Sequence, residues 1–324
     1  MDVKDTVAPW WRGAYVSFMT RSRAPIALFV YARLDHTIRT IQALKHNLLA
    51  GESDLTIFAD APKREEISAA VKEVRDYIRT VDGFKSVRIV ERERNMGLAA
   101  SIINGVSSLC GIHGRVIVVE DDLVTSPYFL SYMNDALDMY ADTPEVASIS
   151  GFHPPFRARL PETFFQRDAE CWGWATWKRA WAKFNPDGPA LLADLKRKGL
   201  FKMFDQEGTY PYVRMLEDQI KGRNDSWAIR WRASVILNDM VSLYPGCSLV
   251  RNIGLDGSGT HGDILDMSGE IAVKPVHVEK IPLIHSPEAF RAFVRFNRCF
   301  KWKNRINRLL RKARNWSRKR VSSH

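Results

Sequence analysis

Short apolar runs alternate with segments of helical periodicity through the first half of the chain. In the helical segments, apolar residues recur every three or four positions. Strands that alternate with helices in this way form a largely parallel sheet covered by helices on both faces. The sequence therefore predicts an α/β fold. The expected strands are residues 26–31, 54–60, 86–91, 115–122 and 146–151, and the expected helices are residues 35–51, 62–80, 97–110 and 126–140.

Residues with known terminal preferences mark the ends of two of these helices. The sequence predicts Asp35 as the N-cap and Gly51 as the C-terminal glycine of the first helix. Pro62 predicts the first turn of the second helix, where its missing N–H does no harm.

The character of the chain changes after Gly151, where aromatic residues and prolines become frequent. No second alternating unit follows, so we expect this half to continue the same sheet. A chain of 324 residues is long enough for one large domain. The predicted organisation is an N-terminal extension at 1–24, an α/β half at 25–150, a second half of the same domain at 151–285 and a basic tail at 286–324.

The positive charge is concentrated at the C-terminus. The chain has a formal net charge of +11, and residues 291–324 hold 13 Lys or Arg and no acid. The rest of the chain is nearly neutral, which argues against nucleic-acid binding by the main body. The tail also predicts an amphipathic helix suited to an anionic membrane surface, although RNA binding or simple solvation is an alternative. Its apolar face would hold Phe293, Phe296, Phe300, Ile306, Leu309 and Trp316.

No apolar run approaches the roughly 20 residues that a membrane-spanning helix needs. The start of the sequence lacks the pattern of a secretory signal, and the four cysteines lie far apart without metal-ligand spacing. We therefore expect reduced thiols and a cytoplasmic protein that can associate with the inner face of the membrane.

Three carboxylates, Glu120, Asp121 and Asp122, directly follow the four β-branched residues at 116–119, which are typical of a strand buried on both faces. Ligands of parallel α/β sheets bind beyond the carboxyl ends of the strands. Adjacent carboxylates repel one another unless a cation neutralises them, and their oxygens suit Mg²⁺ or Mn²⁺. The cluster alone leaves a metal site and a solvated strand end open.

The segment "VVEDDL" followed by "SPYFLSYMNDAL" resembles the metal-binding segment of GT-A glycosyltransferases, most strongly the N-acetylglucosaminyltransferase I-like and family-2-like enzymes. The resemblance spans roughly residues 25–263. It implies a Rossmann-like GT-A fold and sugar transfer from a nucleotide-diphosphate donor, UDP-linked by analogy, to a glycan or lipid-linked acceptor in surface polysaccharide synthesis. The other similar segments, in order, are "VYARLDHTIRTIQAL", "IFADAPK", "ERNMGLAASIINGV", "CWGWATWKRAW" and "GTHG".

The resemblance implies roles for residues on the donor side. Asp122 would hold the Mn²⁺ or Mg²⁺ that bridges the donor diphosphate, with Asp121 and Glu120 facing the ribose or assisting the metal. Asp60 would meet the nucleotide base, and residues around Arg33 would line the base pocket. The alternatives are a helix cap for Asp60 and a surface cation for Arg33.

Asn95 and Gly97 fall where such enzymes let the backbone approach the nucleotide. Gly97 tolerates φ values that other residues avoid, and it precedes a helix whose N-terminus favours anions. An ordinary loop glycine is the alternative.

On the acceptor side, an inverting transfer needs a carboxylate that takes the proton of the acceptor hydroxyl. The resemblance places this base at Asp225, with Asp218 and Ser226 as alternative positions. Asp225 could instead cap a helix that starts at Trp227.

Three further residues complete the implied site. Trp174 would stack on a sugar, and Gly173 would let the backbone approach a ligand. His261 would complete the metal shell or contact the diphosphate, unless it is a surface histidine.

Two other functions remain open. A sugar-phosphate nucleotidyltransferase shares the sheet and the metal, but it should carry a glycine-rich loop after the first strand, where this chain has "YARLDH". A non-catalytic sugar-binding scaffold is the second alternative.

Overall fold

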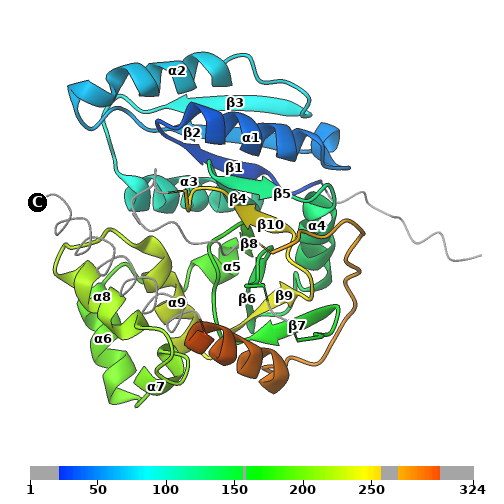
Figure 1. Ribbon diagram of the computed structural model, residues 1–324, viewed down its shortest axis with the longest axis vertical. Helices are drawn as coiled ribbons and strands as arrows, with labels where there is room; N and C mark the ends of the chain where they lie inside the picture. The colour runs from blue at the N-terminus through cyan, green and yellow to red at the C-terminus, as the bar shows by residue number, and fades with distance from the viewer. Residues whose placement is uncertain (1–21, 156–157, 257–268, 300–324) are drawn as a thin grey trace, which may run out of the picture.

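The computed structural model describes residues 22–155, 158–256 and 269–299. It confirms the predicted α/β fold, with one large, mostly parallel sheet flanked by helices (Figure 1). Its strand order is β3-β2-β1-β4-β8-β6-β9-β7, and only β8 and β7 run antiparallel to the others among the described residues. The strands are β1 (Ile26–Val30), β2 (Asp54–Ala59), β3 (Ser86–Glu91), β4 (Arg115–Glu120), β6 (Val146–Ser150), β7 (Thr163–Gln166), β8 (Trp174–Trp177) and β9 (Val241–Pro245), beside a small sheet of β5 (Leu123–Thr125) and β10 (Val250–Asn252).

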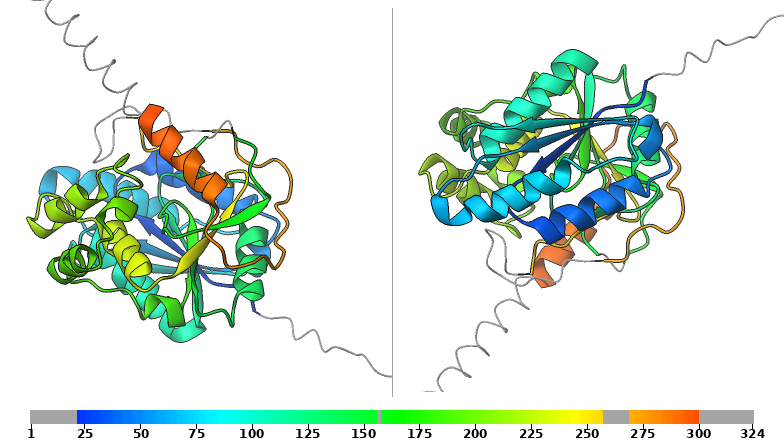
Figure 2. Two further views of the ribbon diagram at one scale, coloured as in Figure 1. Left: turned by 90° about the horizontal axis from the view of Figure 1, so that it is seen from below. Right: turned by 90° about the horizontal axis from the view of Figure 1, so that it is seen from above.

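Helices cover both faces of the sheet. Figure 2 shows α1 and α2 on one side of the first strands and α3 on the other. A group formed by α6 to α9 lies beyond α3 and has its own small apolar core. The helices are α1 (Leu34–Lys45), α2 (Ser68–Ile78), α3 (Leu98–His113), α4 (Phe129–Met139), α5 (Lys178–Trp181), α6 (Gly188–Arg197), α7 (Phe201–Phe204), α8 (Tyr212–Ile220) and α9 (Trp227–Leu237).

The predicted ends of α1 are wrong. Arg33 is its N-cap residue, and Asp35 lies within the first turn. The helix ends at Lys45 because the Asn47 side chain donates to the carbonyl of Ala43 at 2.9 Å and competes with further helical bonds. Gly51 lies in a separate 3₁₀ turn, Ala50–Glu52.

The predicted start of α2 is also wrong. A 3₁₀ turn at Glu65–Ile67 precedes the helix, which begins at Ser68 rather than Pro62. Before this turn, the Lys63 N–H donates to the Tyr31 hydroxyl at 3.0 Å. This hydrogen bond holds the connection between β2 and α2 close to the end of β1, so that the helix begins later in the sequence.

The second half of the chain adds β8, β6, β9 and β7 to the sheet begun by β1 to β4. β8 inserts beside β4 with Val118 opposite Trp174. The apolar side chains of both halves form a single buried cluster. The residue ranges assigned to the extension, the two halves and the tail remain predictions.

The first part of the basic tail folds against the protein. Residues 287–299 form a helix, orange in Figure 1, in which Phe293 is 5% exposed and packs edge-on against Tyr244. Asn297 donates to the Gln206 side chain at 2.6 Å. The prediction that Phe293 belongs to a membrane-facing stripe is therefore wrong, because it covers the protein's own core.

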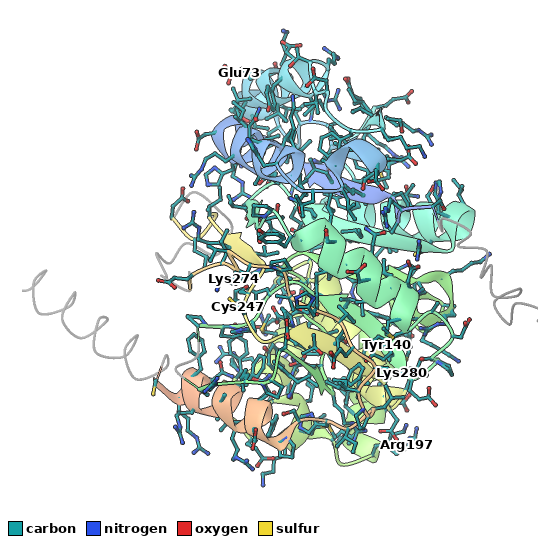
Figure 3. All side chains as sticks on the ribbon, turned by 90° about the vertical axis from the view of Figure 1, so that its right-hand side faces the viewer. Glu73, Tyr140, Arg197, Cys247, Lys274 and Lys280 are labelled. Atoms are coloured by element: carbon teal, nitrogen blue, oxygen red, sulfur yellow. The ribbon has the colours of Figure 1, made fainter. Side chains whose placement is uncertain are left out.

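The segment before this helix runs along α4. The Tyr140 hydroxyl donates to the carbonyl of Glu279 at 3.0 Å and accepts from the N–H of Ile281 at 3.1 Å, beside Lys280 in Figure 3. Each helix among the described residues is too short or too polar to span a bilayer.

Candidate active site

The acidic cluster lies where β4 ends, and Arg33 neutralises part of it. The Arg33 Nη2 atom lies 2.5 Å from Asp121 Oδ1 and 2.9 Å from Asp122 Oδ2. Arg33 stands three residues after the end of β1, the strand that pairs with β4. The sheet therefore brings together residues almost ninety positions apart, and Arg33 is not an isolated surface cation.

The guanidinium of Arg33 contacts Asp121 and Asp122, and its charge also acts on Glu120. Burial, followed by the charges of Asp122 and Asp121, raises the pKa of Glu120 to about 8, although Arg33 acts in the opposite direction. Burial also raises the pKa of Asp121, against the attraction of Arg33. For Arg33 itself burial acts to lower the pKa, but Asp121 and Asp122 outweigh it and raise the pKa above its ordinary value. The cluster thus lacks positive charge.

The shortage of positive charge and the carboxylate oxygens of the cluster fit a hard divalent cation. Asp121 and Asp122 are the candidate ligands, although Arg33 bridges their oxygens in this structure. Within the described ranges, no three His, Cys, Asp or Glu side chains are arranged as a set of metal ligands. His261, the other predicted ligand, lies outside the described residues.

A strap of residues 253–256, directly after β10, covers the acidic cluster. The Ile253 N–H donates to the carbonyl of Asp122 at 2.8 Å. A Cβ on Gly254 would collide with the Asp122 carboxylate and would lie 2.7 Å from Arg33 Nη1, so only glycine fits here. His36 Nε2 lies 3.2 Å from Asp256 Oδ2 at the same strap. The sequence does not mark His36 as a site residue, and its only signal for Gly254 is the glycine-rich stretch at 252–263.

Asp60, Asn95 and Gly97 meet at the neighbouring strand end. The Asp60 carboxylate accepts from the N–H groups of Met96 and Gly97, each at 2.9 Å, and from Asn95 Nδ2 at 3.1 Å. Gly97 has φ +76° and directly precedes α3. Asp60 therefore fixes the loop that presents the α3 N-terminus, and it does not cap a helix at Pro62.

Asp60→Ala is expected to destabilise the protein by about 2–4 kcal/mol, because buried donors lose a charged acceptor. Urea denaturation measures this loss. The control is Asp76→Ala, which removes an exposed partner of Lys72 and should leave the unfolding midpoint unchanged. A midpoint for Asp60→Ala equal to that of the wild type would contradict the role assigned to Asp60.

Asp225 reaches this loop from the second half of the chain. Its Oδ2 atom lies 3.4 Å from the position that a Cβ on Gly97 would take. The side chain is 65% exposed, with Arg230 at 3.9 Å. The alternative in which Asp225 caps α9 is wrong, because the cap is Ser226, whose hydroxyl accepts from the N–H of Ile229 at 3.2 Å.

Asp218 is poorly suited to accept the proton of the acceptor hydroxyl. It lies on α8, where a hydrogen bond from Arg223 holds the pKa of its carboxyl below the ordinary value, assisted by the charges of Arg223, Arg214 and Lys221. Proton abstraction favours a base whose pKa lies near the working pH.

The prediction that Trp174 faces a sugar is wrong. Its side chain is 0% exposed and stacks on Trp227 at 5.2 Å, within a cluster that includes Trp181 and Trp231. Gly173, with φ +62°, makes room for Val250 and Phe129 rather than for a ligand. Trp172 is the half-buried ring of this segment, and it packs against Phe152.

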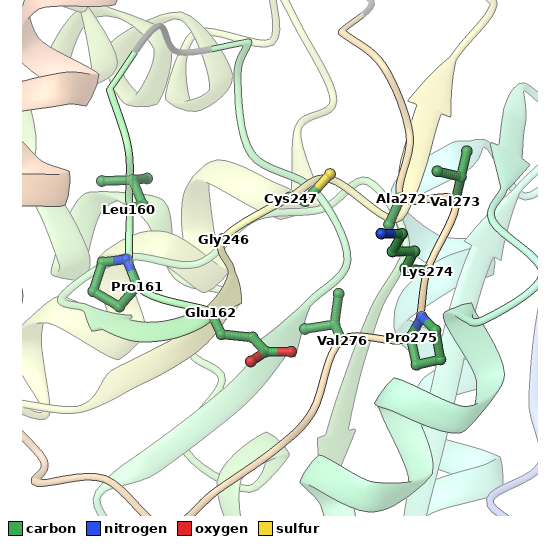
Figure 4. Close-up of a pocket in the computed structure, with 10 residues that line it drawn as sticks. All are labelled: Leu160, Pro161, Glu162, Gly246, Cys247, Ala272, Val273, Lys274, Pro275 and Val276. Atoms are coloured by element: carbon green, nitrogen blue, oxygen red, sulfur yellow. The ribbon is translucent and has the colours of Figure 1, made fainter.

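A separate cavity of about 300 Å³ lies between residues 160–162, 246–247 and 272–276 (Figure 4). Its lining is mostly apolar, and none of Glu120, Asp121 and Asp122 contributes to it. The candidate site is therefore the sheet edge and not this cavity.

No protein-family model matches the chain, and no curated protein is similar to it in sequence. Among solved structures it is similar to a mannosyltransferase from Pyrobaculum calidifontis in complex with GDP-Man and Mn²⁺ (10% identity, 67% of this chain and 69% of that chain, TM-score 0.37). It is also similar to S. aureus TarS (12%, 43% and 24%, 0.29) and to a UDP-glucose pyrophosphorylase complexed with UDP-glucose (11%, 68% and 90%, 0.34).

Proposed function

We propose that the chain is a metal-dependent glycosyltransferase that moves a sugar from a nucleotide-diphosphate donor, UDP-linked by the sequence resemblance, to a glycan or lipid-linked acceptor. The observation that carries this proposal is the meeting of Arg33, Asp60, the α3 N-terminus and the β4 acids at one edge of the sheet. Such an edge binds nucleotides in parallel α/β folds.

In this proposal Asp122 and Asp121 hold a Mn²⁺ or Mg²⁺ ion, which supplies positive charge for the departing diphosphate. Asp60 and Asn95 hold the loop at Gly97 that leads into α3, and the N-terminus of a helix favours an anionic ligand. Asp225, beside Gly97, takes the proton of the acceptor hydroxyl, and the acceptor oxygen bonds to the sugar carbon from the face opposite the diphosphate, whose bond to that carbon breaks with inversion.

The short connection between β1 and α1 argues against a nucleotidyltransferase. It consists of Tyr31, Ala32 and Arg33, and it contains no glycine that could cradle a triphosphate. The unbalanced charge of the acidic cluster argues against a non-catalytic scaffold, because such a cluster costs stability unless it binds a cation.

Incubation with a panel of nucleotide sugars and Mn²⁺ tests the proposal. We expect Mn²⁺-stimulated release of a nucleoside diphosphate from one donor, by slow hydrolysis without an acceptor. Pyrophosphate release from a nucleoside triphosphate and a sugar 1-phosphate would instead identify a nucleotidyltransferase. Inactivity in both assays, with correctly folded protein, would contradict the proposal.

The basic tail supports a second part of the proposal, which is association with an anionic membrane surface. Most of this segment, residues 300–324, lies outside the described residues. The described helix before it exposes Arg291, Arg295 and Arg298. Each basic residue near an anionic surface contributes about 1 kcal/mol to binding.

Truncation after Cys299 keeps the docked helix with its three exposed arginines and is expected to reduce flotation with phosphatidylserine vesicles strongly, while leaving donor hydrolysis unchanged. Binding of the full chain should weaken as salt rises. Neutral phosphatidylcholine vesicles are the control. Equal flotation of the truncated and full chains would overturn this part of the proposal.

A further inference from the structure

Arg33 occupies the carboxylate oxygens that a metal ion would need. Its Nη2 atom lies 2.5 Å from Asp121 Oδ1 and 2.9 Å from Asp122 Oδ2, so one nitrogen bridges the two side chains. A guanidinium is always charged and only donates hydrogen bonds, and a divalent cation binds the same kind of oxygen. Arg33 and a divalent cation therefore compete for these two carboxylates.

The two carboxylates differ in how firmly they are held. Asp121 Oδ2 accepts from the N–H of Tyr31 at 3.3 Å, and the Asp121 carbonyl accepts from the Thr40 hydroxyl at 2.8 Å. Among the described residues, the Asp122 carboxylate accepts a hydrogen bond from Arg33 alone. The Asp122 side chain is also the more exposed of the two, at 17% against 8%. Asp122 is thus the partner that Arg33 can release at the smaller cost.

The strap of residues 253–256 leaves no room for a cation beside the guanidinium. The N–H of Ile253 donates to the carbonyl of Asp122 at 2.8 Å, which holds the strap against this residue. A Cβ on Gly254 would overlap the Asp122 carboxylate and would lie 2.7 Å from Arg33 Nη1. Because even a methyl group does not fit on this side of the carboxylate, a metal ion with its water ligands does not fit there either while Arg33 stays in place.

The main chain of Arg33 is fixed, so a displacement would involve only its side chain. The Arg33 carbonyl accepts from both the N–H and the hydroxyl of Thr37 at 2.9 Å, at the start of α1. The side chain is 27% exposed, and a partly exposed side chain changes rotamer without unfolding the helix behind it. A guanidinium that leaves a carboxylate needs another anion, and phosphate is the anion that arginine binds with two parallel hydrogen bonds.

We propose that Arg33 is the counter-ion of Asp122 in the absence of ligands, that it has to release Asp122 before a divalent cation binds there, and that the phosphate groups of the nucleotide then receive the guanidinium. This inference rests on the proposed function and adds an order to it. A divalent cation alone displaces Arg33 without compensation and binds weakly. The cation and the nucleotide together bind well, and each raises the affinity for the other by the same factor.

Titration of the full chain with Mn²⁺ alone, followed by electron paramagnetic resonance of the free ion, tests the competition. Arg33→Gln removes the competing charge and is expected to bind Mn²⁺ at least about tenfold more tightly than the wild type, since a close charge pair contributes at least that factor. The gain should persist at high salt, because salt screens distant charges more strongly than a partly buried contact.

The same titration with saturating UDP, GDP or dTDP tests the second half of the inference. In the wild type, one of these nucleotides should raise the affinity for Mn²⁺. In Arg33→Gln the increase should be smaller, because no guanidinium passes from Asp122 to the phosphate groups.

Arg39→Gln is the matched control, because Arg39 lies on α1 with an exposed partner, Asp35, at 3.7 Å. It should bind Mn²⁺ like the wild type. Arg33→Lys keeps one charge without the planar fork and should bind Mn²⁺ less tightly than Arg33→Gln. Thermal unfolding covers the case in which Arg33→Gln destabilises the sheet edge, since Mn²⁺ should then raise the Tm of this variant more than that of the wild type.

Equal Mn²⁺ affinity of wild type and Arg33→Gln, or no Mn²⁺ binding and no Mn²⁺-dependent rise in Tm for either protein, would overturn the inference. Failure of the proposed function would appear separately, as a wild type that binds no nucleotide in the presence of Mn²⁺. The comparison with Mn²⁺ alone uses no nucleotide, so it gives its result in either case.

Discussion

Asp122→Asn is expected to reduce Mn²⁺-stimulated hydrolysis of the donor at least about 100-fold. The amide keeps the shape of the side chain but removes a negative charge from the candidate ligand set. A metal that stabilises a departing diphosphate contributes several kcal/mol, and each 1.4 kcal/mol corresponds to a factor of ten. The rate of nucleoside diphosphate release across a Mn²⁺ titration measures the effect.

The control for this variant is Asp35→Asn, which makes the same chemical change on the exposed side of α1, where the carboxylate is 78% exposed. It should hydrolyse the donor like the wild type. Arg33 retains Asp121 as a partner in Asp122→Asn, so the sheet edge should stay folded. Full activity of Asp122→Asn at every Mn²⁺ concentration would show that the acids do not serve the donor.

Asp168→Ala is expected to lower the free energy of unfolding by about 3–5 kcal/mol, the cost of leaving a buried charge without its partner. Asp168 forms an ion pair with Arg232, and the two side chains are 7% and 4% exposed. Asp168 also accepts from Gln206 Nε2 at 2.9 Å, and Gln206 accepts from Asn297 of the C-terminal helix. Asp168→Ala should therefore destabilise both the α6–α9 group and the C-terminal helix of residues 287–299.

Urea denaturation measures this loss against two comparisons. Asp194→Ala breaks an exposed pair with Arg197 and should leave the midpoint nearly unchanged. The double variant Asp168→Leu with Arg232→Met removes both charges and should recover part of the stability that Asp168→Ala loses. A loss below about 1 kcal/mol for Asp168→Ala would mean that Arg232 finds water or another partner.

The sheet could be predicted from the sequence because β-branched runs such as 116–119 are typical of strands buried on both faces. Boundaries were less predictable where a tertiary contact decided them. Pro62 has the local preference of a helix start, but the bond between Lys63 and Tyr31 holds this stretch in an irregular path. Local preference is a weak guide once such contacts form.

The sequence resemblance names Arg33, Asp60 and the β4 acids as site residues, but it does not predict the contacts between them. Nothing near Arg33 in the sequence indicates that it bridges Asp121 and Asp122, because the contact depends on β1 pairing with β4. Trp174 was misplaced for a related reason. A Trp-rich segment suits a sugar platform and a core equally, and only the packing of α9 on β8 decides between them.

Calorimetric titration of the full chain with UDP, GDP and dTDP, with Mn²⁺ and again with EDTA, tests the central claim most directly. If the edge formed by Arg33, Asp60, Gly97 and the β4 acids is a donor site, one nucleotide, expected to be UDP, binds with Mn²⁺ and loses its affinity in EDTA and in Asp122→Asn. If no nucleotide binds, or if one binds equally well without metal and without the Asp122 carboxylate, the claim is contradicted.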